Sequence, residues 1–172
     1  MKQGPRYHVK PRRRREGKTD YRKRLNLLKS RKIRLVIRKS LKNIQVQFIE
    51  YKEKGDGIIV SAKSNELKNK YQWKYSTSTT PAAYLTGLLA GKKAIDKGVE
   101  ESVLDIGRNF SVTGSKIFAV VKGVRDAGIE CPCDEDKTPN EERLTGKHLD
   151  KNITSAVNDI KIKIMEVNNA SK

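Results

Sequence analysis

Arginine and lysine side chains crowd the first quarter of the chain, and their chemistry is the binding of phosphate and other anions. Residues 1–42 hold 18 of the 38 basic residues but only 2 of the 20 acidic ones, which gives this segment a net charge of +16. The remaining residues, 43–172, carry only +2 of the total of +18. A solvated surface normally mixes both signs. We therefore expect the first segment to bind a polyanion and the remainder to be an ordinary globular body.

The run Arg12 to Arg15 indicates that the polyanion is a nucleic acid. A guanidinium group binds phosphate through two parallel hydrogen bonds and stacks on bases, whereas a helix on a membrane surface would need an apolar face. Residues 1–18 contain only three apolar side chains, Met1, Tyr7 and Val9. A segment of this composition cannot offset the entropy of ordering itself. We expect a tail that is disordered when free and lies along phosphate when bound.

Other residue types offer little chemistry. Cys131 and Cys133 do not have the spacing of a zinc knuckle, and a metal site would need two further ligands, so a turn before an acidic loop is the preferred interpretation. The sequence has no nucleophile elbow, P-loop or dinucleotide fingerprint. The acids that could hold Mg²⁺ in a metal nuclease match no known ligand spacing; they are Asp96, Glu100, Glu101, Asp105 and Asp126. We expect no enzyme activity, no metal and no cofactor, with a nuclease as the alternative.

No segment is suited to a membrane. The longest run of purely apolar side chains is Ile117 to Val121, far too short to cross a bilayer. No apolar stretch follows the first basic residues, as a secretory signal peptide would require. We expect a cytosolic protein without a membrane partner.

The basic residues must be positioned by a helix and a strand. Thr19 can cap a helix that runs to Ser30, with Tyr21, Leu25 and Leu28 as a stripe that docks on the body. The opposite side of this helix, which we expect to meet an anion, carries Arg22, Lys23, Arg24 and Lys29. In residues 33–40, Ile33, Leu35 and Ile37 alternate with Arg34, Val36 and Arg38, which predicts a strand with one basic face.

The rest of the pattern predicts an α/β fold. Strands at 44–50 and 58–60 follow turns at Lys42-Asn43 and Gly55 to Gly57, so three strands form an antiparallel meander. A short helix over 64–70 precedes a helix from Thr80 to about residue 97, in which Ala82, Leu85, Leu88, Leu89 and Ile95 face the core.

A strand at 103–106, a helix between Ser115 and Gly128, a helix opened by a capping box at Thr138 and a C-terminal amphipathic helix complete the pattern. The apolar side of the last helix comprises Ile153, Ala156 or Val157, Ile160, Ile164 and Val167, and could pack on the body or on a partner.

Two helices against a mixed sheet predict an α/β sandwich with a basic N-terminal extension. We divide the chain into an RNA-binding tail (1–18), an α/β RNA-binding body (19–149) and a C-terminal helical segment (150–172). Hydroxyl groups at Ser76 to Thr80 precede a helix and could form a phosphate site or serve only as a cap. Because the first strands lack the aromatic residues of single-strand binders, composition and layout favour shape and phosphate recognition of folded RNA.

Three blocks of sequence resemble one known family. They are the segment Thr19 to Leu25 with Leu28 to Ser30 and Arg34 to Ser40, the segment Thr80 to Gly91, and the pair Val103 to Gly107 and Gly114 to Ala119. In this order, over roughly residues 5–148, they are similar to the universal large-subunit ribosomal proteins that bind 5S rRNA, numbered eighteen in bacteria and five in eukaryotes. The central block resembles the archaeal and eukaryotic branch, and the absence of a long C-terminal extension favours the archaeal type.

The resemblance implies an α/β body that is seated on 5S rRNA in the central protuberance, beside large-subunit rRNA and neighbouring ribosomal proteins, without catalytic activity. It implies that the tail threads between RNA segments and that the first helix, the first strand and the hydroxyl loop contact 5S rRNA. The residues that we expect to contact RNA are Arg6, Tyr7, Lys10, Arg12, Arg13, Arg14, Arg15, Lys18, Tyr21, Arg22, Arg24, Arg31, Arg34, Arg38, Ser40, Lys42, Ser76, Thr77, Ser78, Thr79 and Thr80. The segment after Leu149 has no counterpart in this resemblance.

Overall fold

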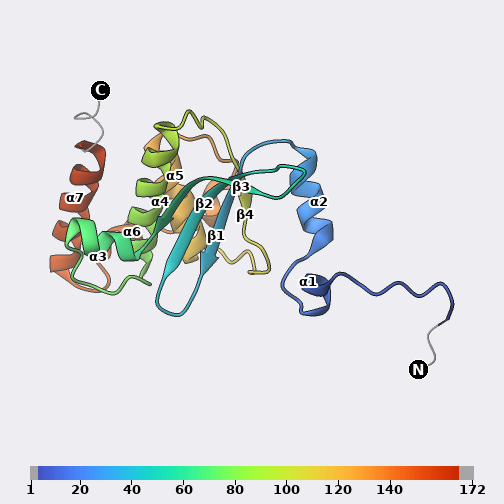
Figure 1. The fold of residues 1–172 in the computed structure, drawn as a ribbon. Coiled ribbons are helices and arrows are strands. Elements are labelled where there is room, and N and C mark those ends of the chain that lie inside the picture. Colours follow the sequence, from blue (N-terminus) through green and yellow to red (C-terminus); the bar gives the residue numbers. More distant parts are fainter. Residues whose placement is uncertain (1–3, 167–172) are drawn as a thin grey trace.

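A four-stranded mixed sheet with helices packed on one face forms the body of the protein. The computed structural model describes residues 4–166 (Figure 1). In chain order the elements are α1 (Arg12–Arg15), α2 (Tyr21–Lys29), β1 (Arg34–Lys39), β2 (Ile44–Glu50), β3 (Gly57–Lys63), α3 (Asn65–Tyr71), α4 (Thr80–Ile95), β4 (Val103–Asp105), α5 (Lys116–Ala127), a 3₁₀ turn (Glu135–Lys137), α6 (Glu141–Thr145) and α7 (Lys151–Glu166).

The strand order is β3-β2-β1-β4. β1, β2 and β3 pair antiparallel in sequence order, which confirms the predicted meander. β4 joins the other side of β1 in parallel, with Arg34 opposite Val103 and Val36 opposite Asp105. The mixed sheet of the expected α/β fold is therefore present, and β4 brings residues beyond 100 next to the first strand.

Alternation along β1 separates a helix-covered face from a basic face, as predicted. Leu35 and Ile37 are fully buried in the apolar core beneath α4 and α5, together with Phe48 of β2. Arg34 and Val36 lie on the other face, where the N-terminal segment passes. Figure 1 shows α4 and α5 on one side of the sheet and α2 on the other. The side chains of one strand thus serve both the core and the outer surface.

Helices α4 and α5 pack closely because both carry glycine at their contact. A Cβ atom at Gly87 would overlap the backbone carbonyl of Val120, and one at Gly123 would overlap the carbonyl of Tyr84. The cap of α4 is Thr79, whose hydroxyl accepts the N–H of Ala82, rather than the predicted Thr80. Ile95, predicted to face the core, is the last residue of α4 and is 41% exposed.

The C-terminal half contains the predicted helices, with one wrong cap. α5 begins after Ser115 and ends at Gly128, whose left-handed conformation stops it. α6 begins after Asn140, and the expected capping box is absent because the Thr138 hydroxyl donates instead to the carbonyl of Glu135.

Helix α7 packs on the body, against α4. It buries Ile153, Val157, Ile160 and Ile164 there, and Ala156, the alternative to Val157, is partly buried against the same core. Val167, predicted to continue this stripe, lies outside the described residues. No helix within residues 4–166 is long and apolar enough to span a membrane.

The N-terminal segment leaves the body and carries its own short helix. The run Arg12 to Arg15, predicted as part of an unstructured tail, forms one helical turn, α1, none of whose residues is buried. Figure 1 shows this segment (blue) extending away from the sheet beyond α2. The tail and α2 thus present their basic side chains apart from the neutral body.

The contact between α4 and α5 can be tested by Gly87→Ala. The added methyl group meets backbone atoms that cannot move without separating two helices, so we expect a loss of about 1–3 kcal/mol in the free energy of unfolding. Urea unfolding measures it. Gly57→Ala is the matched control, because its methyl group would meet only the flexible end of Lys52. A similar loss in both variants would contradict close helix packing as the cause.

Candidate nucleic-acid interface

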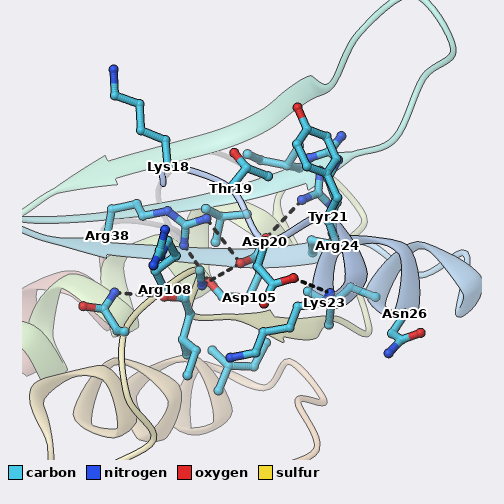
Figure 2. Close-up of a pocket in the computed structure, with 18 of the residues that line it drawn as sticks. Lys18, Thr19, Asp20, Tyr21, Lys23, Arg24, Asn26, Arg38, Asp105 and Arg108 are labelled. Carbon is cyan, nitrogen blue, oxygen red and sulfur yellow. Dashed lines mark hydrogen bonds and ion pairs between the residues drawn. The ribbon is translucent and has the colours of Figure 1, made fainter. Parts of the chain in front are cut away.

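A cleft of about 1080 Å³ lies between the N-terminal segment and the open face of the sheet. The lining residues come from the N-terminal segment between Arg13 and Leu27, the outward side of β1, Ile49 of β2, Asp56 of the β2–β3 turn, and Leu104 to Asn109 at the end of β4 and in the loop that follows it. Figure 2 shows Arg38 and Asp105 of the sheet facing the segment that carries Asp20 and Arg24. The topology of the sheet therefore gathers five of the thirteen predicted basic residues around one opening, namely Arg13, Lys18, Arg24, Arg34 and Arg38.

Three arginines and two aspartates form a continuous ion-pair network across this cleft. Both terminal nitrogens of Arg24 donate to Asp56, at 2.8 and 3.0 Å. Arg34 bridges the two acids, with 2.8 Å to Asp56 and 3.1 Å to Asp105. Arg38 completes the network at 3.2 Å from Asp105 and donates to the Asp105 backbone carbonyl at 2.9 Å. The network joins α2, the β2–β3 turn, β1 and β4.

Burial differs strongly along the network, and so does the charge available to a ligand. The Arg34 side chain is 3% exposed and that of Arg24 is 31% exposed, whereas that of Arg38 is 46% exposed. Three guanidinium groups and two carboxylates leave one positive charge. That charge lies nearest solvent at Arg38.

Arg34 therefore does not lie on the exposed basic face that the sequence predicted. A buried guanidinium is tolerated only when acids neutralise it, and Asp56 and Asp105 do so. Its Nε atom has no hydrogen-bond partner within the described residues. In this structure Arg34 acts on the interface indirectly, by holding in place the acids that orient Arg24 and Arg38.

Helix α2 is attached through its basic side and not through the predicted apolar stripe. Leu25 is 58% exposed and Tyr21 is 38% exposed, and no residue of α2 is buried. Arg24 makes the long-range contact instead, and Leu27 lines the cleft. The cap is Asp20 rather than Thr19, because its carboxylate accepts the N–H groups of Arg22 and Lys23. A helix held by one ion pair is weakly fixed on the body.

Hydrogen bonding accounts for the electrostatics of the α2 contact. The Arg24 guanidinium lowers the pKa of Asp56 below its usual range, and the Asp56 carboxylate raises the pKa of Arg24. The backbone N–H of Lys23, with that of Arg22, lowers the pKa of Asp20. These acids stay ionised at neutral pH, so the charges described here are permanent.

The loop after β4 is tied both to the sheet and to the N-terminal segment. Asp105 accepts the N–H of Gly107 at 2.8 Å, and the Arg108 guanidinium donates to the backbone carbonyl of Gly17. Sequence reasoning missed Arg108 and Asp56 as residues of this cleft. The excess of arginine in the sequence indicated that these side chains have binding partners. Which residues those partners are depends on the pairing of β1 with β4.

The hydroxyl loop Ser76 to Thr80 lies at the other end of β1, beside the β1–β2 turn. The Thr77 hydroxyl donates to the carbonyl of Lys42 at 2.6 Å, and Thr79 caps α4. Thr77 and Thr80 are each 6% exposed, so only Ser76 of this loop is fully on the surface. The bonds of Thr77 and Thr79 give the loop a structural role, and its contact with RNA stays a prediction.

The remaining residues that we predicted to contact RNA differ in the exposure of their side chains. Arg24, Ser78 and Thr79 are partly buried. The exposed ones are Arg6, Tyr7, Lys10, Arg12, Arg13, Arg14, Arg15, Lys18, Tyr21, Arg22, Arg31, Arg38, Ser40, Lys42 and Ser76.

Known proteins match this chain over most of its length. The sequence model of a family described as "Ribosomal large subunit proteins 60S L5, and 50S L18" matches residues 5–101. A protein of Korarchaeum cryptofilum (strain OPF8), named large ribosomal subunit protein uL18, is 53% identical over 149 residues, which cover 87% of this chain and 76% of that protein. The chain belongs to this family. It is a large-subunit ribosomal protein of the archaeal type, a structural component of the cytoplasmic ribosome and not an enzyme.

Membership of the family agrees with the chemistry of the cleft. Asp105, the best of the acids considered for a metal nuclease, binds two guanidinium groups and a backbone N–H. The described residues contain no group of three or more acids, histidines or cysteines that could hold a metal ion. Cys131 is buried and Cys133 is partly buried, both as free thiols. Asp105 lies beyond the stretch that the family model matches.

The structural role of Asp105 can be measured with Asp105→Asn. Loss of the negative charge leaves the buried Arg34 with Asp56 alone, so we expect the free energy of unfolding to fall by about 3 kcal/mol. Urea unfolding of both proteins gives this difference. Glu101→Gln removes an acid that pairs with Lys32 in solvent and should cost less than about 1 kcal/mol. Equal losses would show that burial does not decide the effect.

The attachment of α2 can be tested with Arg24→Gln. Loss of the ion pair to Asp56 should speed hydrogen exchange of the α2 amides roughly fivefold, the equivalent of about 1 kcal/mol, while amides of α4 and α5 remain unchanged. Arg22→Gln, on the same helix, is the control, because its side chain forms no ion pair within residues 4–166.

The same attachment should depend on pH. Because the folded state lowers the pKa of Asp56, the pair stabilises α2 fully above the ordinary carboxyl pKa of about 4, and this stabilisation is lost as the pH falls through the folded pKa. In the Arg24→Gln protein the part of this pH dependence that comes from the Arg24–Asp56 pair should be lost, and the part that comes from the Asp20 cap, whose pKa is also lowered, should remain. Persistence of the first part would assign it to another acid.

Proposed function

We propose that this protein binds 5S rRNA and helps to attach it to the large-subunit rRNA in the central protuberance. The observation that carries the proposal is the set of cations on the N-terminal segment that no acid neutralises. Within residues 4–166, the basic side chains of residues 4–31 that form no ion pair are those of Arg6, Lys10, Arg13, Arg14, Arg15, Arg22, Lys23, Lys29 and Arg31. Phosphate is the partner that such a surface requires.

We assign a role to each segment of the chain from the distribution of its charge. Residues 1–18 are the RNA-binding tail, residues 19–149 are the body that binds 5S rRNA, and residues 150–172 are the C-terminal segment, whose helix α7 is described as far as Glu166. Arg12 and Lys18 share Glu16, so even in the tail some cations are held in place. We place the contacts to large-subunit rRNA on the tail, since it extends farthest from the sheet (Figure 1). Neighbouring ribosomal proteins are the expected partners of the surfaces that remain.

The body contributes fewer contacts than the sequence implied. Arg22 and Arg38 present guanidinium groups to solvent and are proposed as direct phosphate contacts, with Ser40 and Lys42 at the far end of β1. Arg34 is proposed to support the interface from beneath. This arrangement recognises a folded RNA by the positions of its phosphates rather than by its base sequence.

Equilibrium binding at several salt concentrations tests the proposal. The protein should bind 5S rRNA more tightly than an unrelated RNA duplex of similar length, and the logarithm of its binding constant should fall with the logarithm of salt concentration by about 0.7–0.9 for each phosphate neutralised. Several contacts therefore give a slope of many units. Comparable affinity for the unrelated duplex would overturn the proposed specificity.

A matched pair of variants locates the contact. Arg22→Ala should reduce the salt slope by roughly one phosphate, about 0.7–0.9, because its guanidinium is exposed and unpaired. Lys163→Ala, on the exposed side of α7, removes the same charge and should leave the slope unchanged. Identical slopes in the two variants would exclude α2 from the interface.

A further inference from the structure

A second, smaller cleft lies on the outer side of the N-terminal segment and carries an exposed aromatic ring. Phe110, in the loop after β4, is 87% exposed. It borders a cleft of about 500 Å³ with Arg14, Arg108 and residues 19–23. A volume of this order suits a ligand of nucleotide size. The exposed ring leaves an aromatic face open to a stacking partner.

The rim of the Phe110 cleft is cationic. Arg14, Arg22, Lys23 and Arg108 line it, against the single acid Asp20. The Asp20 carboxylate already accepts two backbone N–H groups as the cap of α2. The side chains of Arg14, Arg22 and Lys23 form no ion pair within residues 4–166. Any ligand of this cleft must bring negative charge.

Contacts between distant parts of the chain build the cleft. Arg108 donates to the carbonyl of Gly17, 91 residues earlier in the chain. Asp105 accepts the N–H of Gly107, and the Asn109 amide donates to the carbonyl of Ile106 at 2.9 Å. The start of the loop is thereby fixed, and Phe110 is presented at a defined place beside the basic segment. An ordered aromatic ring loses less entropy on stacking than a mobile one.

We propose that the Phe110 cleft binds one unpaired nucleotide of the bound RNA, with its base stacked on the Phe110 ring and its phosphate on Arg14, Arg22 and Lys23. This inference rests on the proposed function, which it deepens by naming the element of RNA that the site takes. Aromatic rings stack on bases of any sequence, and arginine and lysine bind the adjoining phosphate. A paired base cannot reach the ring, because both of its faces are already stacked in the helix. A protein segment would have to supply both an apolar group and several acids.

The first test is the affinity of Phe110→Ala for 5S rRNA. We expect binding to weaken by roughly fivefold to a hundredfold, the range found for one base stacked on an aromatic ring, with an unchanged salt slope because no charge is lost. Phe110→Tyr should bind as the original protein does. Val112→Ala is the matched control, since Val112 is 58% exposed in the same loop but does not line the cleft.

The second test observes the stacking directly. The chain has one tryptophan, Trp73, which is 3% exposed, so Phe110→Trp adds a separate surface fluorophore. Short single-stranded oligoadenylate should quench it. The same strand annealed to oligouridylate should quench it much less.

The outcomes separate this inference from the proposed function. If Phe110→Ala binds 5S rRNA as tightly as the original protein, or if duplex and single strand quench the new tryptophan equally, the inference is overturned while 5S binding stands. If neither form of RNA quenches the tryptophan, the inference is also overturned. A protein segment is then the remaining candidate for the occupant of the cleft. If the original protein does not distinguish 5S rRNA from the unrelated duplex, the proposed function fails. The quenching experiment with oligoadenylate then tests the Phe110 cleft by itself, since it does not depend on 5S rRNA.

Discussion

Two carboxylates, those of Asp56 and Asp105, control how the positive charge of this protein can be used. Arg24, Arg34 and Arg38 converge on one face of the sheet, where three unneutralised guanidinium groups would repel one another. The acids reach them from opposite sides, one from the β2–β3 turn and the other from the end of β4. Because each acid contacts two arginines, loss of either acid unpairs Arg24 or Arg38 and leaves Arg34 with a single acid, and the network sets the position of α2 relative to β1.

The network separates structural cations from those available to RNA. Arg34 is a buried structural ion, and α2 has no buried residue, so charge rather than apolar area fixes it to the body. Attachment of this kind is weak and screened by salt. In the proposed function, phosphates neutralise the side chains that no internal acid reaches, and the entropy of ordering the segment is offset only when the RNA is present. A strongly basic segment can thus belong to a folded protein without a larger core.

Local sequence patterns predicted most of the fold but little of the ion-pair network. Alternation along β1 predicted which side chains face the helices, and Ser115 with Gly128 predicted both ends of α5. The burial of Arg34 could not be read from the pattern, because its acids lie 22 and 71 residues away and meet it only through strand pairing. The apolar stripe on α2 was misleading for a related reason: Asp56, 32 residues from Arg24, decides which side of the helix faces the sheet.

Asp105 also links the two clefts, and this determines from which direction RNA can approach. Phosphate is repelled by the same acids that hold the arginines, so it approaches where cations outnumber them. Within the network this is the Arg38 end, next to Gly107 and the loop that Asp105 fixes. Arg108, which borders both clefts, continues the positive surface from Arg38 to Arg14 and Arg22. In the proposed function, Asp105 therefore orients the cations that lead an RNA backbone toward the exposed ring of Phe110, where the proposed stacking takes place.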